Sequence, residues 1–279
     1  MLIDSHVHLL PERLASKIRR FFEDRGSARL LYPYAPQAAR QALVSAGIGR
    51  CWSLPYAHRA GVASPLNRWM QETFREDPFV VPGATVHPDD DVSAVVREAA
   101  VELGLEVFKL HCSVGSFAPD DRRLDPLWKT VSGGGQPVIV HGGSAPGGTA
   151  TAAEVEAIGR VAARWPVARI IVAHFGSPSE RATLDLMAAS PSVFADLTPV
   201  VADPVQVTGA DIAGLERRIL FGSDTPTVAV AIEDSLARVR SWRLSPADEA
   251  AVLGGNAARL VPGARAAARS DPASREARP

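Results

Sequence analysis

The chain has 279 residues, of which 46% are hydrophobic and 22% charged, and its formal net charge is −1, values typical of a globular protein. A nearly neutral chain produces no field that would attract nucleic acid or an anionic membrane, and two cysteines provide no disulfide framework. No apolar run approaches the roughly 20 residues of a membrane helix, and the first residues do not have the pattern of a secretory signal. We therefore expect a cytoplasmic protein that binds neither nucleic acid nor membrane.

Short apolar segments recur along the chain, and stretches with helical character separate them. They predict eight β-strands, at residues 2–8, 48–54, 79–86, 105–111, 137–141, 169–174, 192–197 and 218–223. Most of these segments show little polar alternation, as is expected of parallel strands that are covered on both faces. Eight strands alternating with helices predict an α/β fold, a single (β/α)8 barrel of the TIM type, over residues 1–262.

The last segment, residues 263–279, differs from the rest of the chain. It reads GARAAARSDPASREARP and has no apolar face that could dock on a barrel. A segment of this composition cannot bury enough apolar surface to offset the entropy lost on ordering. We therefore predict a short disordered tail that follows one barrel domain.

Potential metal ligands stand at the ends of the predicted strands. His6 and His8 close the first strand, and because side chains alternate between the faces of a strand, both imidazoles point to the same side. His141 and His174 end the fifth and sixth strands, and Asp224 follows the eighth. The active site of a (β/α)8 barrel lies at the carboxyl ends of its strands, so we expect these side chains to meet.

Imidazole and carboxylate ligands together favour a first-row divalent ion, Zn²⁺ above all, with Mn²⁺, Fe²⁺ or Co²⁺ as alternatives. Water bound to such an ion becomes a nucleophile near neutral pH and then needs a base. His174 is the best candidate for that base, because its strand lies between the strands that carry His141 and Asp224. Asp224 could bind the metal, accept a proton, or do both.

The fourth predicted strand ends with Lys109 and His111, which are two residues apart and share a face. We expect Lys109 to contact a substrate anion, and the alternative is that it pairs with a buried acid. His111 could contact the substrate as well. By the same alternation Asp4 shares a face with His6 and His8, where it would support a histidine or simply make a buried hydrogen bond.

Five segments together resemble the amidohydrolase superfamily, and in detail its amidohydrolase-related branch, called amidohydrolase 2. They are MLIDSHVHLL, PVIVHGG, IIVAHFG, ILFGSDTP and GGNAARL. The resemblance implies that His6, His8, His141 and Asp224 are the ligands of one metal ion and that His174 is the catalytic residue near its water. The branch contains lactonases and other hydrolases, a hydratase and metal-dependent decarboxylases.

The resemblance leaves alternatives open. Dinuclear members of the superfamily use a strand-four carboxylated lysine or glutamate to bridge two metals, and Lys109 could do so if His174 were also a ligand. The short chain favours a hydrolase of a small ester, lactone or amide over a decarboxylase of an aromatic or enoic acid. A binding barrel without catalysis is the third possibility, and the complete ligand set disfavours it. We expect a small-molecule substrate, and assembly into a homo-oligomer stays open.

Overall fold

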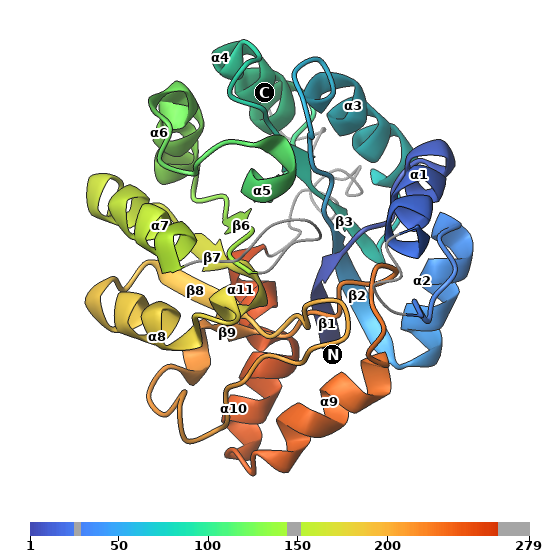
Figure 1. Ribbon diagram of the computed structural model, residues 1–279, viewed down its shortest axis with the longest axis vertical. Helices are drawn as coiled ribbons and strands as arrows, with labels where there is room; N and C mark the ends of the chain where they lie inside the picture. The colour runs from blue at the N-terminus through green and yellow to red at the C-terminus, as the bar shows by residue number, and fades with distance from the viewer. Residues whose placement is uncertain (25–28, 144–151, 262–279) are drawn as a thin grey trace, which may run out of the picture.

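The computed structural model describes residues 1–24, 29–143 and 152–261 (Figure 1). All eight predicted strand regions contain strands, and the third is divided in two. The strands are β1 (Leu2–Val7), β2 (Ile48–Ser53), β3 (Val80–Pro82), β4 (Ala84–Thr85), β5 (Phe108–Leu110), β6 (Val138–Val140), β7 (Ile170–Val172), β8 (Val193–Asp196) and β9 (Ile219–Leu220). They pair in parallel, in the order β1-β2-β3 and β4 through β9.

Gly83 joins the two sheets. Its N–H donates to Ser53 O of β2 at 2.8 Å, and the next residue, Ala84, donates to Val107 O at 2.8 Å. The run 80–85 therefore pairs with β2 through its first half and with β5 through its second half. A Cβ at Gly83 would lie 2.8 Å from Ser53 O, so the approach of the two backbones requires glycine here.

The ring closes between β9 and β1. Ser5 donates to Phe221 O from both its N–H, at 2.9 Å, and its Oγ, at 2.8 Å. One residue further along β1, His6 O accepts from Asp224 N at 2.9 Å. These bonds, with the junction at Gly83, connect all the strands into the predicted barrel.

Helices surround the strands (Figure 1). The α-helices are α1 (Glu12–Glu23), α2 (Pro36–Ser45), α3 (Ala63–Phe74), α4 (Val92–Arg97), α5 (Cys112–Gly115), α6 (Asp125–Gly134), α7 (Ala152–Arg164), α8 (Glu180–Ala189), α9 (Ile232–Ser241), α10 (Pro246–Ala250) and α11 (Asn256–Leu260). Short 3₁₀ or π segments are η1 (Glu98–Glu102), η2 (Arg122–Leu124), η3 (Ala173–Gly176), η4 (Glu216–Arg218) and η5 (Ala251–Gly255). No helix within the described ranges is long and apolar enough to cross a membrane.

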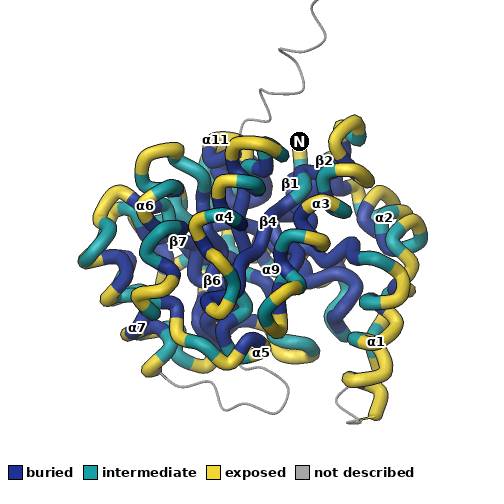
Figure 2. The backbone as a smooth tube through the Cα atoms, turned by 90° about the horizontal axis from the view of Figure 1, so that it is seen from above, coloured by how far each residue is buried: buried dark blue, intermediate teal, exposed yellow. Residues whose placement is uncertain are grey.

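The strands separate two apolar layers. In β6, Ile139 belongs to the cluster inside the barrel, whereas its neighbours Val138 and Val140 pack outside, against the helices. Side chains along β7 alternate in the same way, with Ile171 inside the barrel. Both layers are apolar because both faces of the barrel wall are buried, which confirms the interpretation of the uninterrupted apolar segments. Figure 2 shows the strands as the buried centre of the molecule.

Helix α11 closes one end of the barrel. Ala257, Leu260 and Val261 pack with Ile3 and Leu220 in the inner cluster. In Figure 2, α11 lies beside the N-terminus, at the opposite end from α5, which directly follows β5. The apolar plug therefore fills the end where strands begin and leaves the other end to polar side chains. The predicted tail, 263–279, lies outside the described residues.

Replacing Ile171 tests the inner layer. Ile171 is fully buried, so Ile171→Ala should lower the free energy of unfolding by about 2–5 kcal/mol, as cavity-forming substitutions do. Val167 is 67% exposed, and Val167→Ala should change stability by less than about 0.5 kcal/mol. Urea denaturation of both variants measures the difference. Equal losses would show that the barrel interior is not closely packed at Ile171.

Candidate metal centre

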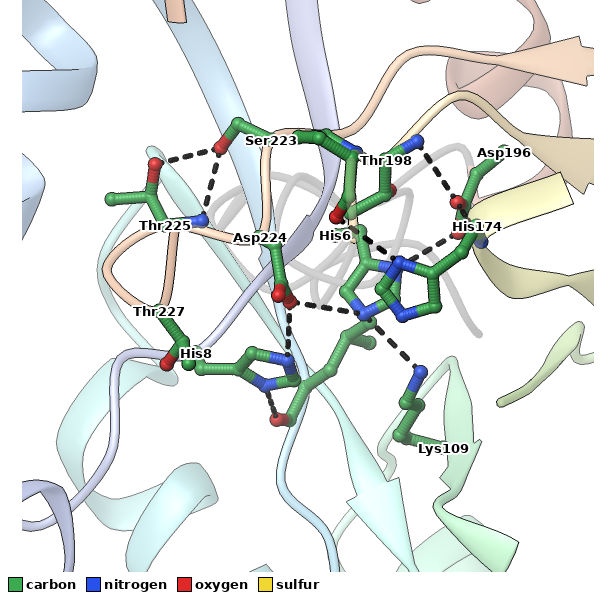
Figure 3. Close-up of polar contacts among 12 residues, drawn as sticks. His6, His8, Lys109, His174, Asp196, Thr198, Ser223, Asp224, Thr225 and Thr227 are labelled. Carbon is green, nitrogen blue, oxygen red and sulfur yellow. Dashed lines mark hydrogen bonds and ion pairs between the residues drawn. The ribbon is translucent and has the colours of Figure 1, made fainter. Parts of the chain in front are cut away.

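His6 in β1 and His8 directly after it present the same ring nitrogen to a common point. Both contact Asp224, whose Oδ1 lies 3.0 Å from His8 Nε2 and 3.7 Å from His6 Nε2 (Figure 3). The opposite ring nitrogens are held from behind, because His6 Nδ1 lies 2.8 Å from Asp196 Oδ2 and His8 Nδ1 lies 2.7 Å from Leu54 O. A carbonyl or carboxylate oxygen can only accept, so each ring donates from Nδ1, and the neutral ring of His6 keeps a lone pair on Nε2.

His174 reaches the same point by a left-handed turn. β7 ends at Val172, and His174, Phe175 and Gly176 then have φ values of 54°, 52° and 72°. Non-glycine residues rarely adopt this conformation, and here a hydrogen bond of 2.8 Å from His174 N to Asp196 Oδ1 helps to hold it. The imidazole Nδ1 faces Pro199 O at 3.3 Å, which again leaves Nε2 as the lone-pair atom.

Asp224 completes a compact cluster with two of these rings. It follows β9 with φ 62°. His6, His174 and Asp224 each offer one ligand atom within 4.8 Å of one another, and all three residues are buried. The structure thus places His174, which the sequence predicts to be the base, in one cluster with His6 and Asp224, two of the four predicted ligands. The division between ligand and base stays a prediction.

His141, the remaining predicted ligand, lies beside the cluster rather than within it. Its ring centroid is 4.8 Å from that of His174, and it stacks on His111 at 3.9 Å with an interplanar angle of 17°. Both ring nitrogens of His141 are buried and have no hydrogen-bond partner among the described residues. A buried imidazole with unsatisfied nitrogens is costly, so His141 is suited to a partner that the described residues do not supply, and a cation fits that requirement.

Lys109 and His111 lie on the same side of β5, as their spacing predicts. Lys109 is fully buried, and its Nζ lies 3.2 Å from His6 Nε2. Burial lowers the pKa of Lys109 to about 8, and the carboxylates of Asp196 and Asp224 oppose this shift. The direct polar contact of Lys109 is therefore an imidazole rather than a buried acid. His111 stacks on His141 and contacts the ring of Tyr56 at 5.0 Å.

The charge states suit cation binding. Burial and the nearby Lys109 lower the pKa of His6 to about 3, and burial also lowers the pKa values of His174 and His141. Burial by itself would raise the pKa of Asp224, but the hydrogen bond from His8 and the neighbouring imidazoles hold that pKa below its usual value. Neutral imidazoles beside an ionised carboxylate are the forms that coordinate a divalent metal.

Two buried carboxylates support the site in different ways, and Asp4 follows the second of the two roles expected for it, a buried hydrogen bond. Asp4 Oδ1 accepts from the backbone N–H groups of His6 and Ser223, both at 3.1 Å, so Asp4 supports the backbone and not an imidazole. The reason is a register shift between Asp4 and Val7, which breaks the alternation along β1. Burial raises the pKa of Asp4 to about 7. The carboxylate that does hold the His6 ring is Asp196, which the sequence analysis missed although it is the next-to-last residue of the predicted strand 192–197.

The comparisons place the chain among known proteins. The profile of the amidohydrolase family matches residues 3–263. A comparison with curated proteins gave no match.

Solved structures share the fold at low identity. An uncharacterised TIM-barrel protein from Bordetella bronchiseptica has a TM-score of 0.72 and 21% identity, covering 95% of this chain and 99% of that one. The 5-carboxyvanillate decarboxylase of Sphingomonas paucimobilis has a TM-score of 0.67 and 16% identity, covering 93% of this chain and 98% of that one. A dihydroxybenzoic acid decarboxylase from a Polaromonas species, with bound manganese, has a TM-score of 0.69 and 16% identity, covering 97% of this chain and 99% of that one.

Gly222 tests how tightly the site is packed. A Cβ at this position would lie 2.9 Å from His6 Cβ and would also meet Thr198 Oγ1, so Gly222→Ala should lower the free energy of unfolding by about 1–3 kcal/mol, as overpacking does. Gly133 in α6 has open space around its Cβ position, and Gly133→Ala should instead raise stability by about 0.5–1 kcal/mol. Urea denaturation compares the two variants. A Gly222→Ala protein as stable as the wild type would contradict the close packing.

Proposed function

The chain belongs to the amidohydrolase family, and we propose that it is a metal-dependent hydrolase that cleaves a small ester, lactone or amide. The observation that carries this proposal is the convergence of three imidazoles, each held through Nδ1, with the ionised Asp224 at the carboxyl end of the barrel. Such an arrangement offers nitrogen and oxygen lone pairs to one cation and keeps a neutral imidazole beside it.

We infer that His6, His8, His141 and Asp224 hold one divalent ion, and that His174 is not a ligand. The ring nitrogens of His141, which have no hydrogen-bond partner in the described part of the chain, support its place in this set. The mixed imidazole and carboxylate donors suit Zn²⁺, and manganese in the Polaromonas structure makes Mn²⁺ the main alternative. Bound there, the ion would polarise a carbonyl group and lower the pKa of water.

His174 would serve as the general base and then as the general acid. Its neutral ring donates through Nδ1 toward Pro199 O, so Nε2 is free to accept a proton from water as the oxygen attacks the substrate carbonyl carbon. The same Nε2 would return that proton to the leaving alkoxide or amine, which restores the neutral ring. We further propose that Lys109 and His111, on the neighbouring strand, contact the substrate.

A decarboxylase is the second candidate, and Lys109 favours it. The buried Lys109 lies against His6, where an ammonium group could bind a substrate carboxylate. Two of the similar solved structures are decarboxylases of aromatic acids. In that reaction carbon dioxide leaves, and no water oxygen enters a product carbonyl.

Metal content tests the site directly. Protein purified without chelator should contain about one divalent ion per chain by elemental analysis. Chelation should abolish turnover, and Zn²⁺ or Mn²⁺ should restore it. Two tightly held ions per chain would favour the arrangement in which Lys109 bridges a dinuclear centre, and a fully active metal-free protein would rule out a metal-dependent reaction.

The division of roles predicts different losses at two histidines. His174→Asn should retain the metal and the fold while turnover falls about 10²–10⁴-fold, because a proton-transfer group is removed. His141→Asn should lose metal affinity together with activity. Elemental analysis and kinetics on both variants separate these outcomes. Equal loss of metal from both would make His174 a ligand.

Product analysis separates the two reactions. A panel of lactones, esters, amides and aromatic or enoic acids should reveal turnover of a compound with a hydrolysable bond. In water enriched in ¹⁸O, hydrolysis must place the label in the product carboxylate, with no release of carbon dioxide. Release of carbon dioxide without incorporation of the label would replace the hydrolase with the decarboxylase.

A further inference from the structure

Asp196 connects β1 and the turn that follows β7 through one buried carboxylate. It ends β8 and is fully buried. Its Oδ2 lies 2.8 Å from His6 Nδ1, and its Oδ1 accepts from His174 N at 2.8 Å and from Thr198 N at 3.2 Å (Figure 3). Each oxygen therefore holds a different part of the centre, the ring of one histidine and the backbone of another.

The contact with His6 decides which ring nitrogen carries the proton. An ionised carboxylate can only accept, so His6 must donate from Nδ1 and keep a lone pair on Nε2. The opposite side of the ring agrees with this assignment, because Lys109 Nζ, a donor, lies 3.2 Å from His6 Nε2. Both neighbours thus require the same tautomer, and it is the one whose Nε2 can bind a cation.

The contact with His174 acts on the backbone. A left-handed conformation is unfavourable for histidine, and it persists only where surrounding bonds hold it. The bond from His174 N to Asp196 Oδ1 anchors the first residue of that turn, at φ 54°. The direction in which the His174 ring leaves the barrel wall therefore depends on the same carboxylate.

We propose that Asp196 is a positioning residue, which fixes the Nδ1–H tautomer of His6 and the left-handed turn at His174 so that both rings direct Nε2 toward Asp224. The importance of this arrangement for turnover rests on the proposed function. The tautomer of His6 and the turn at His174 do not depend on the proposed function, and both can be measured in metal-free protein.

Asp196→Asn alters one of the two contacts selectively. The amide oxygen can still accept from the N–H groups of His174 and Thr198, which places the amide NH₂ against His6 Nδ1. Two donors cannot share a hydrogen bond, so the His6 proton must move to Nε2. The reverse orientation would put the NH₂ against two backbone N–H groups and is worse.

Asp4→Asn is the matched control. Asp4 is equally buried, but its Oδ1 accepts from the backbone N–H groups of His6 and Ser223, and an amide oxygen retains both bonds. The Asp4→Asn substitution therefore removes a buried acid two residues from His6 without placing a hydrogen-bond donor against the His6 imidazole.

The experiment is ¹⁵N NMR of histidine-labelled, metal-free protein, with the His6 signals assigned by a His6→Gln variant. Wild type and Asp4→Asn should show His6 protonated at Nδ1, and Asp196→Asn should show it protonated at Nε2. Competition with a chromophoric chelator then measures Zn²⁺ affinity, which should fall about 10–100-fold in Asp196→Asn and stay unchanged in Asp4→Asn.

Three results would overturn the positioning role: a wild-type His6 protonated at Nε2, an Asp196→Asn protein that keeps the Nδ1–H tautomer, or a switched tautomer with unchanged Zn²⁺ affinity. The wild-type spectrum decides the question even if Asp196→Asn fails to fold. If the tautomer switches as expected while neither wild type nor variant binds Zn²⁺, Asp196 keeps its role and the proposed function fails.

Discussion

The hydrogen bonds that close the barrel between β9 and β1 are the constraint on which the site depends. His6 O accepts from Asp224 N, and the side chains of these two residues then face one another although 218 positions of sequence separate them. Without closure, the first strand would be the edge of an open sheet, and its histidines would lie far from the residues that follow the last strand. The proximity of His6 and Asp224 at the carboxyl end is thus a consequence of barrel closure.

The site concentrates polar groups where burial is unfavourable. Lys109, Asp196 and His6 are fully buried, and each is kept in place by a partner of complementary hydrogen-bonding character. Partnering lowers the cost of burying such groups but does not make the cluster a source of stability. Stability comes from the apolar layers inside and outside the barrel wall and from the plug formed by α11. One end of the barrel, where α11 packs, thus contributes to stability, and the opposite end carries the polar site.

The choice between hydrolysis and decarboxylation depends on few side chains. Both reactions could use the same imidazoles and the same acid, so the proposed metal ligands do not discriminate between them. The two proposed reactions differ in the group that must meet the substrate, and the structure brings the amine of the buried Lys109 to within 3.2 Å of His6 Nε2. Low-identity structural similarity establishes the barrel but leaves this choice to the side chains of this chain.

The sequence by itself determined the positions of the strands and the gathering of His6, His8, His174 and Asp224 at one end. This was possible because each strand is a short apolar segment that ends at a polar residue, and parallel strands in a barrel bring their carboxyl ends together. The pairing of His6 and His8 on one side also followed from local geometry, since Val7 between them packs outward.

Only the tertiary structure decided which atoms meet. The register shift in β1 directs Asp4 to backbone N–H groups, which decides between the two roles expected for it. The left-handed turn brings the His174 ring to His6 and Asp224, and Asp196 is the carboxylate that holds the His6 ring. Each of these depends on contacts between segments that are distant in the sequence, in a register that local patterns do not encode. Periodicity therefore predicts which strand end a residue occupies, whereas the partner of each nitrogen and oxygen is fixed only when the barrel closes.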